Sequence, residues 1–126
     1  GVADSVVQTD GRLAKHADIL PVYSGADLFV HPTAAEGASL TIVEAMACGL
    51  PVITVGRGAV AEYVDGGALT IDEPTPDKLE HAIRRVLTDP ALAAELGRKA
   101  VARSRDLRLD ATARGTLDVM RKVAAR

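Results

Sequence analysis

Aromatic residues are almost absent from this sequence: its 126 residues include two tyrosines, one phenylalanine and no tryptophan. Surfaces that bind single-stranded nucleic acid usually stack bases on several aromatic side chains, so the composition argues against a nucleic-acid partner. A single cysteine, Cys48, excludes a disulfide within the chain and any cysteine-rich metal site. No histidines or carboxylates follow the spacing of metal ligands, so we expect no metal site. No apolar run approaches the length of a membrane span.

The residues that are present describe a domain-sized chain with an uneven charge distribution. Hydrophobic residues make up 48% of the sequence, which is enough for a packed core, and the low cysteine content fits a cytoplasmic location. The net charge is −2, yet the segment from Arg98 to Arg126 holds nine Lys/Arg against three Asp/Glu. Such a basic helical tail fits peripheral contact with an anionic membrane or an acidic neighbouring domain. The alternative is an ordinary set of solvated helix faces.

Short apolar segments alternate with helical patterns along the chain. Strands are expected at 28–31, 52–55 and 68–71, and a weaker strand signal at 5–8 precedes a turn signal at 9–11. Helices are expected starting near Asp18 with Pro21 in the first turn, over 39–48, after the capping residues Thr75 and Asp89, and after Asp110. Strands alternating with helices indicate an α/β fold, a Rossmann-like parallel sheet with flanking helices. Ligands of such sheets bind outside the carboxyl ends of the strands.

The segment 39–48 predicts a short buried helix. Ser39 can cap its start through its hydroxyl, and Gly49 suits the left-handed residue that ends many helices. Apolar residues cover nearly every direction around this helix, which is typical of a buried helix. One narrow polar stripe nevertheless runs along the helix through Thr41, Glu44 and Cys48, because the second and third of these follow Thr41 by three and seven residues.

Two carboxylates flank the start of this helix. Glu44 lies within it, and Glu36 precedes it in a loop that contains Gly37. Burying an ionised carboxylate is costly without a partner, so one interpretation is a ligand lying along the stripe. The free N–H groups and partial positive charge of a helix start suit a phosphate. The alternative is that Glu44 reaches the surface and Glu36 is an ordinary loop charge.

Three runs of residues carry a resemblance to a known family. Residues 26–33, Glu36-Gly37 and residues 44–53 together closely resemble retaining glycosyltransferase family 4, whose members use nucleotide sugars and have the GT-B fold. The two glutamates, with seven residues between them, match that family's Glu-x7-Glu signature. A weaker resemblance extends from Val6 to the C-terminus. It implies that residues 1–126 are a C-terminal donor-binding domain, incomplete at its N-terminal side and without the N-terminal acceptor domain.

The resemblance also implies roles for the residues around the two glutamates. Glu36 would be the catalytic residue and accept hydrogen bonds from hydroxyls of the donor sugar, whereas Glu44 would hold the ribose hydroxyls of the nucleotide. Members of the family need no metal, so no cofactor is implied, and the nucleotide-diphosphate sugar is a substrate.

Backbone groups complete the donor-binding set that the resemblance implies. The N–H groups of Gly37, Ala38 and Ser39 would face the sugar, and those of Leu40 and Thr41 would meet the diphosphate at the helix start. The family commonly has an aromatic residue and a glycine at the positions of Ala38 and Ser39, so the identity of the sugar stays open.

Three further residues are possible ligand contacts. His31 ends the strand before the Glu36 loop, where it serves either as a ligand contact or as an ordinary strand-end residue. Gly58 belongs to a loop that in the family reads Gly-Gly-x-Pro-Glu, of which this chain keeps Gly58 and Glu62. Arg57 is a candidate replacement for the upstream cations that neutralise the diphosphate in the family.

The resemblance therefore predicts a hexosyltransferase-type enzyme in the full-length protein, transferring a sugar from a nucleotide-diphosphate sugar to an acceptor with retention. The chain alone is expected to be inactive, because the acceptor domain that completes the cleft is its partner. An uncovered strand at 28–31 predicts either cover by Val6 and Val7 or a homo-oligomer through that edge. Two alternatives remain: a non-catalytic nucleotide- or phosphate-binding α/β module, and an interaction domain that keeps only the scaffold.

Overall fold

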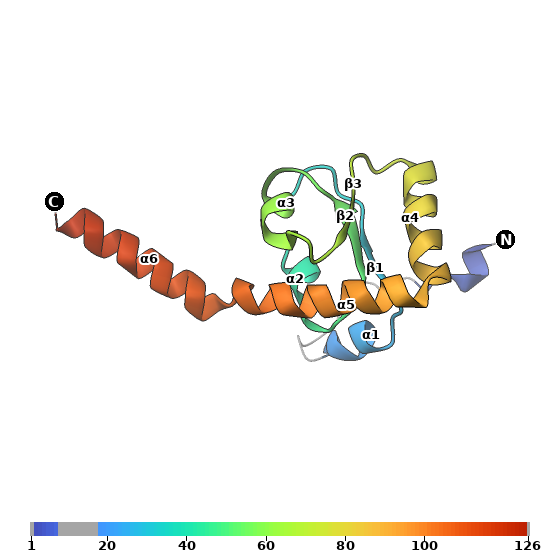
Figure 1. Ribbon diagram of the computed structural model, residues 1–126, viewed down its shortest axis with the longest axis horizontal. Helices are drawn as coiled ribbons and strands as arrows, with labels where there is room; N and C mark the ends of the chain where they lie inside the picture. The colour runs from blue at the N-terminus through green and yellow to red at the C-terminus, as the bar shows by residue number, and fades with distance from the viewer. Residues whose placement is uncertain (1, 8–17, 126) are drawn as a thin grey trace.

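The computed structural model describes residues 2–7 and 18–125 (Figure 1). Its elements follow the alternation expected from the sequence. In chain order they are η1 (Val2–Ser5), α1 (Leu20–Ser24), β1 (Phe29–His31), α2 (Leu40–Ala47), β2 (Val52–Val55), α3 (Gly58–Val64), β3 (Leu69–Ile71), α4 (Pro76–Thr88), α5 (Pro90–Ser104), η3 (Arg105–Leu107) and α6 (Leu109–Ala124).

The three strands form one parallel sheet in the order β1-β2-β3. Phe29 pairs with Val52 across the first ladder, and Ile53 pairs with Leu69 across the second. All four residues of β2 are buried, as its continuous apolar sequence predicts for a central parallel strand. The predicted fold class and all three predicted strands are therefore confirmed, with the first and third strand each beginning one residue later.

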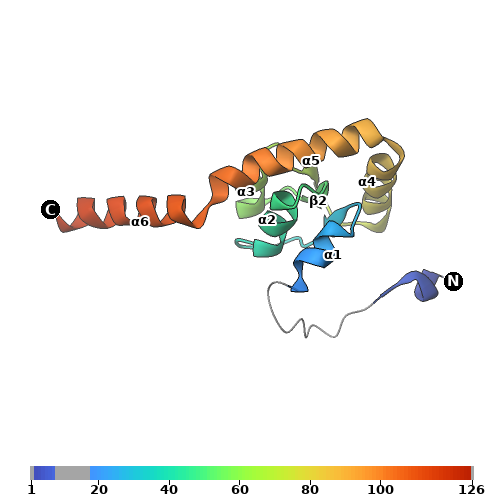
Figure 2. The ribbon, with the colours of Figure 1, turned by 90° about the horizontal axis from the view of Figure 1, so that it is seen from below.

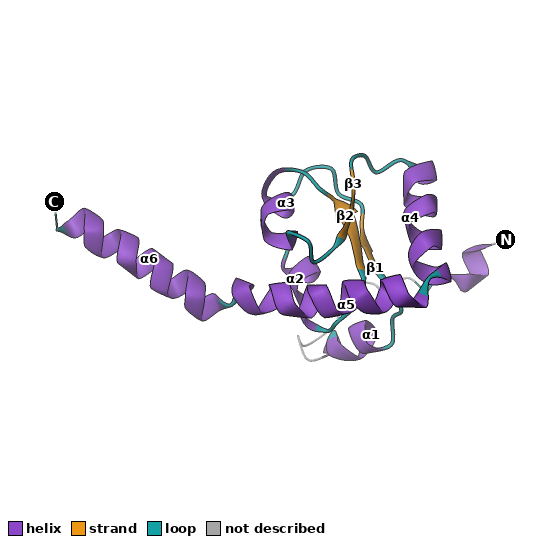
Figure 3. Ribbon diagram, viewed as in Figure 1, coloured by secondary structure: helices purple, strands orange, loops and turns teal. Residues whose placement is uncertain are grey.

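Helices cover both faces of the sheet, as Figure 3 shows by element type. Val52 points to one face and joins the core cluster of α2 and α3, whereas its neighbour Ile53 points to the other and packs with α4 and α5. Helix α5 runs across the end of the sheet in Figure 1, and it contributes Ala100 to the first cluster and Leu96 to the second. One helix thus connects the two packed layers.

Helix α2 is buried on one face only. Ile42, Ala45 and Met46 have no exposed surface, but Leu40 is 69% exposed. The predicted burial of this helix is therefore confirmed for the face that packs on the sheet, whereas its outer side is not covered by any of the described residues. Its C-terminal end is as predicted: Gly49 has φ 79°.

The end of α2 also has the hydrogen bonds of a Schellman motif. The N–H of Gly49 donates to the carbonyl of Met46, and the N–H of Leu50 donates to that of Ala45. The chain reverses there, and Pro51 leads directly into β2.

Two of the predicted helix caps are confirmed. The Thr75 hydroxyl accepts from the N–H of Lys78 at 3.4 Å, and the Asp89 carboxylate accepts from the N–H of Leu92 at 3.0 Å. A proline follows each cap at the first helical position. These caps could be predicted from local sequence alone, because the capping side chain and the amide that it accepts from are three residues apart.

Of the other two predicted helix starts, one is confirmed and one needs correction. Helix α1 begins at Leu20, near Asp18 as predicted, and Pro21 lies in its first turn. Helix α6 begins at Leu109, so Asp110 is inside the helix and is not its cap. The Asp110 carboxylate instead pairs with Arg108 at 3.0 Å and with Arg114 at 3.1 Å. These ion pairs engage the carboxylate that the prediction assigned to a backbone amide.

The weak strand signal near the N-terminus was wrong for the residues that the structure describes. Val2–Ser5 form the 3₁₀ helix η1, and Val6 and Val7 lie outside any strand, 66% and 91% exposed. Gln8 and the turn at 9–11 lie outside the described residues. Within the described chain, β1 pairs with β2 alone, and Val6 and Val7 do not cover its other edge. Self-association through this edge stays a prediction.

Helix α6 extends away from the rest of the molecule (Figures 1 and 2). None of its residues is buried. Two of its cations have carboxylate partners on the same helix, Arg114 with Asp110 and Arg121 with Asp118 at 3.5 Å. This pairing favours the solvated-face interpretation of the basic tail, and membrane contact stays a prediction. Over the described residues, no helix has both the length and the apolar character for crossing a membrane.

Candidate functional site

The carboxyl edge of the sheet brings the predicted site residues into one region. Strand β1 ends at His31, and residues 32–39 lead from it into α2. Strand β2 is parallel to β1, so Arg57 and Gly58 follow it at the same edge. This is the edge at which ligands bind to open parallel sheets.

His31 faces the loop that carries Glu36. Its Nε2 lies 3.4 Å from the Ser39 hydroxyl and 3.8 Å from the Glu36 carboxylate. Its Nδ1 is buried and has no hydrogen-bond partner among the residues that the structure describes. Its carbonyl accepts from the Thr54 hydroxyl at 3.1 Å, and its ring stacks on Phe29. The strand end is therefore held by its neighbours, while the ring contacts the loop.

Ser39 occupies the cap position of α2 but does not cap it with its side chain. Its hydroxyl lies 2.9 Å from the Thr41 hydroxyl, so the predicted hydroxyl-to-amide bond was wrong. The Thr41 hydroxyl and the His31 ring both lie within hydrogen-bond distance of the Ser39 hydroxyl. The Ser39 N–H donates to the Tyr63 hydroxyl at 3.3 Å, which means that one of the amides expected to face the sugar already has a partner.

Tyr63 connects α3 to the Glu36 loop. Burial raises the pKa of its hydroxyl, the hydrogen bond from Ser39 acts in the opposite direction, and the nearby Glu36 carboxylate raises it again. The phenol therefore stays protonated at neutral pH and holds the end of the loop against α3. The sequence analysis did not single out this residue.

Glu44 is fixed by a second tyrosine that the sequence analysis also missed. The hydroxyl of Tyr23 donates to Glu44 Oε2 at 3.0 Å and lies 3.4 Å from the carbonyl oxygen of Thr41. Tyr23 is only 6% exposed, and burial, followed by the hydrogen bond and charge of Glu44, raises its pKa to about 12. Glu44 itself is half-buried. The carboxylate is therefore held by a hydrogen bond from Tyr23 while part of the side chain stays exposed.

A small cavity of about 110 Å³ opens between α1 and α2 beside this carboxylate. Its lining residues are Ile19, Leu20, Tyr23, Glu44, Ala47 and Cys48. Cys48 is exposed and lies one turn beyond Glu44 on the predicted polar stripe. The walls of the cavity are mostly apolar, and the Glu44 carboxylate is its charged acceptor.

Arg57 and Gly58 follow β2 at the same edge. Arg57 Nη2 lies 3.9 Å from Glu73 Oε1, and its side chain is 55% exposed, so its charged neighbour is Glu73. Gly58 begins α3 with φ 55°, and a Cβ added there would meet nothing within 4 Å. The positive φ of Gly58 explains the glycine without any close contact.

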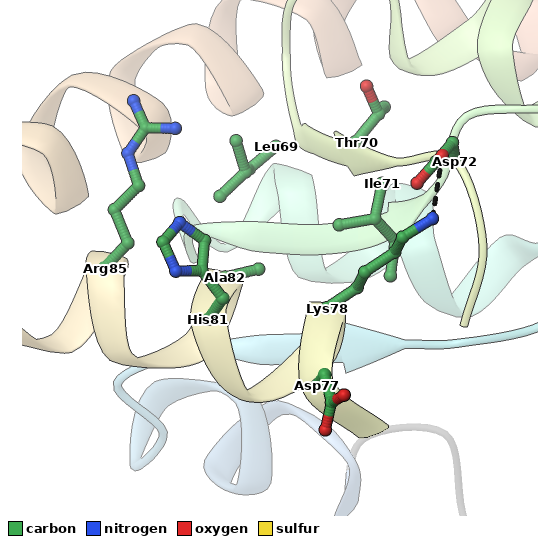
Figure 4. Close-up of a pocket in the computed structure, with 9 residues that line it drawn as sticks. All are labelled: Leu69, Thr70, Ile71, Asp72, Asp77, Lys78, His81, Ala82 and Arg85. Atoms are coloured by element: carbon green, nitrogen blue, oxygen red, sulfur yellow. Dashed lines mark hydrogen bonds and ion pairs between the residues drawn. The ribbon is translucent and has the colours of Figure 1, made fainter. Parts of the chain in front are cut away.

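A larger groove of about 540 Å³ lies between β3 and α4 (Figure 4). Leu69 and Ile71 of β3 line it opposite Lys78, His81 and Arg85 of α4. Lys78 bridges to Asp72 at 2.8 Å within the groove. None of the predicted site residues lines it, so it is separate from the Glu36 loop and from the Glu44 cavity.

In the described part of the chain, no three His, Cys, Asp or Glu side chains come together as a metal site would require. The polar groups that the structure does bring together are the His31, Glu36 and Ser39 side chains and, along α2, the Tyr23–Glu44 pair.

Comparison with known proteins identifies the family. Residues 7–103 match the family model described as glycosyl transferases group 1, and the chain belongs to this family. It is 34% identical over 121 residues to D-inositol 3-phosphate glycosyltransferase of Segniliparus rotundus, covering 93% of this chain and 26% of that protein. It is 36% identical over 107 residues to a GDP-mannose-dependent alpha-(1-6)-phosphatidylinositol monomannoside mannosyltransferase of Mycolicibacterium smegmatis, covering 77% of this chain and 27% of that protein.

A solved structure supports the fold assignment. Sucrose-phosphate synthase from Thermosynechococcus elongatus superposes with a TM-score of 0.74 and 32% identity, covering 86% of this chain and 28% of that one. The fold is that of a Rossmann-like portion of a GT-B glycosyltransferase. The chain spans about a quarter of the length of the relatives that it matches.

Proposed function

We propose that this chain is the donor-binding part of a retaining glycosyltransferase of family 4, which moves a hexosyl group from a nucleoside diphosphate to an acceptor. Membership of the glycosyl transferases group 1 family supports a transferase. The observation that carries the proposal is the Glu44 carboxylate, which Tyr23 fixes at the wall of a small cavity along α2. A fixed, acceptor-only group is well suited to a sugar diol.

The nucleotide lies along α2 in this proposal. The two ribose hydroxyls donate to Glu44 in the cavity, and the diphosphate lies at the N-terminal end of α2, near the amides of Leu40 and Thr41. The first N–H groups of a helix have no partner within it and carry partial positive charge, which stabilises an anion there. Arg57 stays a candidate for additional neutralisation of the diphosphate, and Gly58 for contact in the same loop.

The donor sugar lies against the Glu36 loop in the same proposal. Glu36, the proposed catalytic residue, accepts from sugar hydroxyls, and the N–H groups of Gly37 and Ala38 face the sugar. The N–H of Ser39 can donate to the sugar only if its hydrogen bond to the Tyr63 hydroxyl breaks. His31, 3.8 Å from Glu36, restrains that carboxylate and gives the loop a group that can donate.

The complete reaction requires the rest of the enzyme. We propose a cytoplasmic, metal-independent transferase in which an N-terminal acceptor domain closes the cleft over the sugar. Transfer depends on both substrates being held in a near-attack arrangement, so the chain alone binds donor without transferring it. A non-catalytic nucleotide-binding module is the alternative. It would use the same Glu44 cavity, but it would not need Glu36.

The two glutamates can be separated by titrating variants with a nucleoside diphosphate and with its sugar conjugate, followed by NMR. We expect Glu44→Ala to lower the affinity for both ligands about tenfold or more, because a charge-assisted hydrogen bond contributes roughly 1.5–3 kcal/mol. Glu36→Ala should spare the plain nucleotide and weaken only the nucleotide sugar. With the chain alone, we expect binding of the nucleotide in about the millimolar range.

Glu80→Ala is the matched control, since Glu80 pairs with Arg84 on the outer face of α4, away from the loop. It should change neither affinity. Equal losses for both ligands in both site variants would refute the division of roles. A Glu36→Ala variant with undiminished affinity for every nucleotide sugar tested would favour the non-catalytic alternative.

A further inference from the structure

Tyr23 is a buried residue with its polar end directed at α2. Its ring is edge-on to Phe29, with centroids 5.9 Å apart, and it belongs to the core cluster that includes Ile42 and Ala45. Its hydroxyl lies 3.0 Å from Glu44 Oε2 and 3.4 Å from the carbonyl oxygen of Thr41. Buried hydroxyls take hydrogen-bond partners, and both partners here belong to the helix on which the donor site is built.

We propose that Tyr23 is a positioning residue for donor binding: its hydroxyl holds the Glu44 carboxylate in the orientation that accepts the two ribose hydroxyls. This inference rests on the proposed function, because it assigns Tyr23 a role through Glu44. It also predicts recognition of a ribonucleoside diphosphate in preference to analogues that lack the ribose hydroxyls.

The physical argument concerns the freedom of the Glu44 side chain. A glutamate has three rotatable bonds, and binding a diol freezes them at an entropic cost. A hydrogen bond that already holds the carboxylate removes part of that cost before the ligand arrives. Each carboxylate oxygen accepts more than one hydrogen bond, so accepting from Tyr23 and accepting from a diol are compatible roles for one carboxylate.

The direction of this hydrogen bond is fixed. Burial and the neighbouring carboxylate raise the pKa of Tyr23 to about 12, so the phenol keeps its proton at neutral pH and acts as the donor. Glu44 therefore remains the acceptor, which is the role that ribose hydroxyls require of it. Leu20 of α1 and Ile19, the residue that precedes this helix, line the same cavity as Glu44, so one segment supplies both the wall and the restraint.

Tyr23→Phe tests this role with little disturbance, because phenylalanine keeps the ring and its packing on Phe29. The affinities are measured for ADP, GDP and UDP and for the 2′,3′-dideoxy form of the one that binds most tightly. We expect Tyr23→Phe to weaken the ribonucleotide about threefold to tenfold, the range of one hydrogen bond, and to leave the dideoxynucleotide unchanged. In a Glu44→Ala background, Tyr23→Phe should cause no further loss.

Val22→Ala is the control on the same helix, since Val22 is 55% exposed on the side away from the core. It should leave both affinities unchanged, and thermal unfolding checks that each variant keeps the fold. An unchanged ribonucleotide affinity in Tyr23→Phe, an equal loss for both ligand forms, or an additional loss in the Glu44→Ala background would overturn the inference.

Failure of the proposed function has a different signature. If the wild-type protein does not prefer the ribonucleotide over its dideoxy form and Glu44→Ala has no effect, the ribose assignment fails and the inference fails with it. If the wild-type preference is lost in Glu44→Ala but is undiminished in Tyr23→Phe, the proposed function stands and only the positioning role of Tyr23 is refuted.

Discussion

At the scale of single residues, two tyrosines hold the groups on which the proposed site depends. Tyr23 fixes the Glu44 carboxylate, and Tyr63 holds the amide of Ser39 at the start of α2. Tyr23 is buried and Tyr63 is half-buried, and burial is the largest cause of the raised pKa of each. Side chains of this chain therefore hold both the Glu44 carboxylate and the start of α2.

Because the pKa of Tyr23 is raised in the folded protein, the free energy of unfolding should fall as the pH rises in the alkaline range. In the unfolded chain the phenol loses its proton near pH 10, whereas in the folded protein it does so near pH 12. The contribution to stability is therefore complete below about pH 10 and is lost as the pH rises through about 12. Chemical denaturation over this window should show a steeper fall in the free energy of unfolding for the wild type than for Tyr23→Phe. Parallel pH profiles would contradict the assignment.

The sequence predicted the glutamates but not the tyrosines, and the reason is distance along the chain. Glu44 and Thr41 share a helix face by spacing alone, and Glu36 precedes them in a recognisable loop. Tyr23 reaches Glu44 across 21 residues and Tyr63 reaches Ser39 across 24, contacts that no local pattern encodes. The sequence did offer one indication of these residues, because they are the only two tyrosines in it.

At the scale of secondary-structure elements, the contact between α5 and the end of α2 explains a glycine in the middle of a helix. A Cβ at Gly97 would lie 2.5 Å from the carbonyl oxygen of Gly49, the left-handed residue that follows α2. Glycine weakens a helix interior, so its presence in α5 reflects this close approach of two backbones. The packing of α5 on α2 in turn holds the helix that carries Glu44.

Two matched glycine substitutions test this contact by urea denaturation. Gly97→Ala should lower the free energy of unfolding by about 1–3 kcal/mol, the usual cost of overpacking a filled contact. Gly115→Ala, in the exposed helix α6 where an added Cβ meets nothing within 4 Å, should raise it or leave it unchanged. Removing a glycine from an exposed helix gains at most about 1 kcal/mol. A neutral or stabilising Gly97→Ala would show that the two backbones are not in close contact.

Element starts and ends were predictable wherever the determinant was local. Thr75, Asp89 and Gly49 act within a few residues of themselves, and each has the predicted role. Asp110 and Ser39 do not cap with their side chains, because an ion pair in one case and neighbouring hydroxyl and imidazole groups in the other engage them. The strand signal at 5–8 failed because a strand requires a pairing partner, which an apolar pattern alone does not provide.

At the scale of the whole molecule, three parallel strands carry helices on both faces, and the site lies at their carboxyl edge. The alternation of apolar segments was sufficient to predict this architecture, since a βαβ pattern permits few other arrangements. The position of α6, which extends away from the body, was not predictable, because its sequence is amphipathic and only tertiary contacts decide what covers such a helix.

The chain spans about a quarter of the length of its relatives, and its features fit a part that works with others. The outer side of α2, the free edge of β1 and the apolar side of α6 are all uncovered within the described residues. In the proposed enzyme, the acceptor domain completes the site above the Glu36 loop. The proposed nucleotide half of the site, in contrast, would be formed by α1 and α2 of this chain, which makes the proposal testable with this chain.

The most direct test of the central claim uses Cys48, the single cysteine of the sequence, which is exposed and lines the same cavity as Glu44. Its alkylation rate is followed with a ribonucleoside diphosphate at increasing concentration, with pyrophosphate at the same concentrations, and in Glu44→Ala. The account predicts that the nucleotide slows alkylation in the wild type, that pyrophosphate does not, and that Glu44→Ala loses the protection. An alkylation rate unchanged by nucleotide, or slowed equally by pyrophosphate, would contradict a nucleotide bound with its ribose against Glu44.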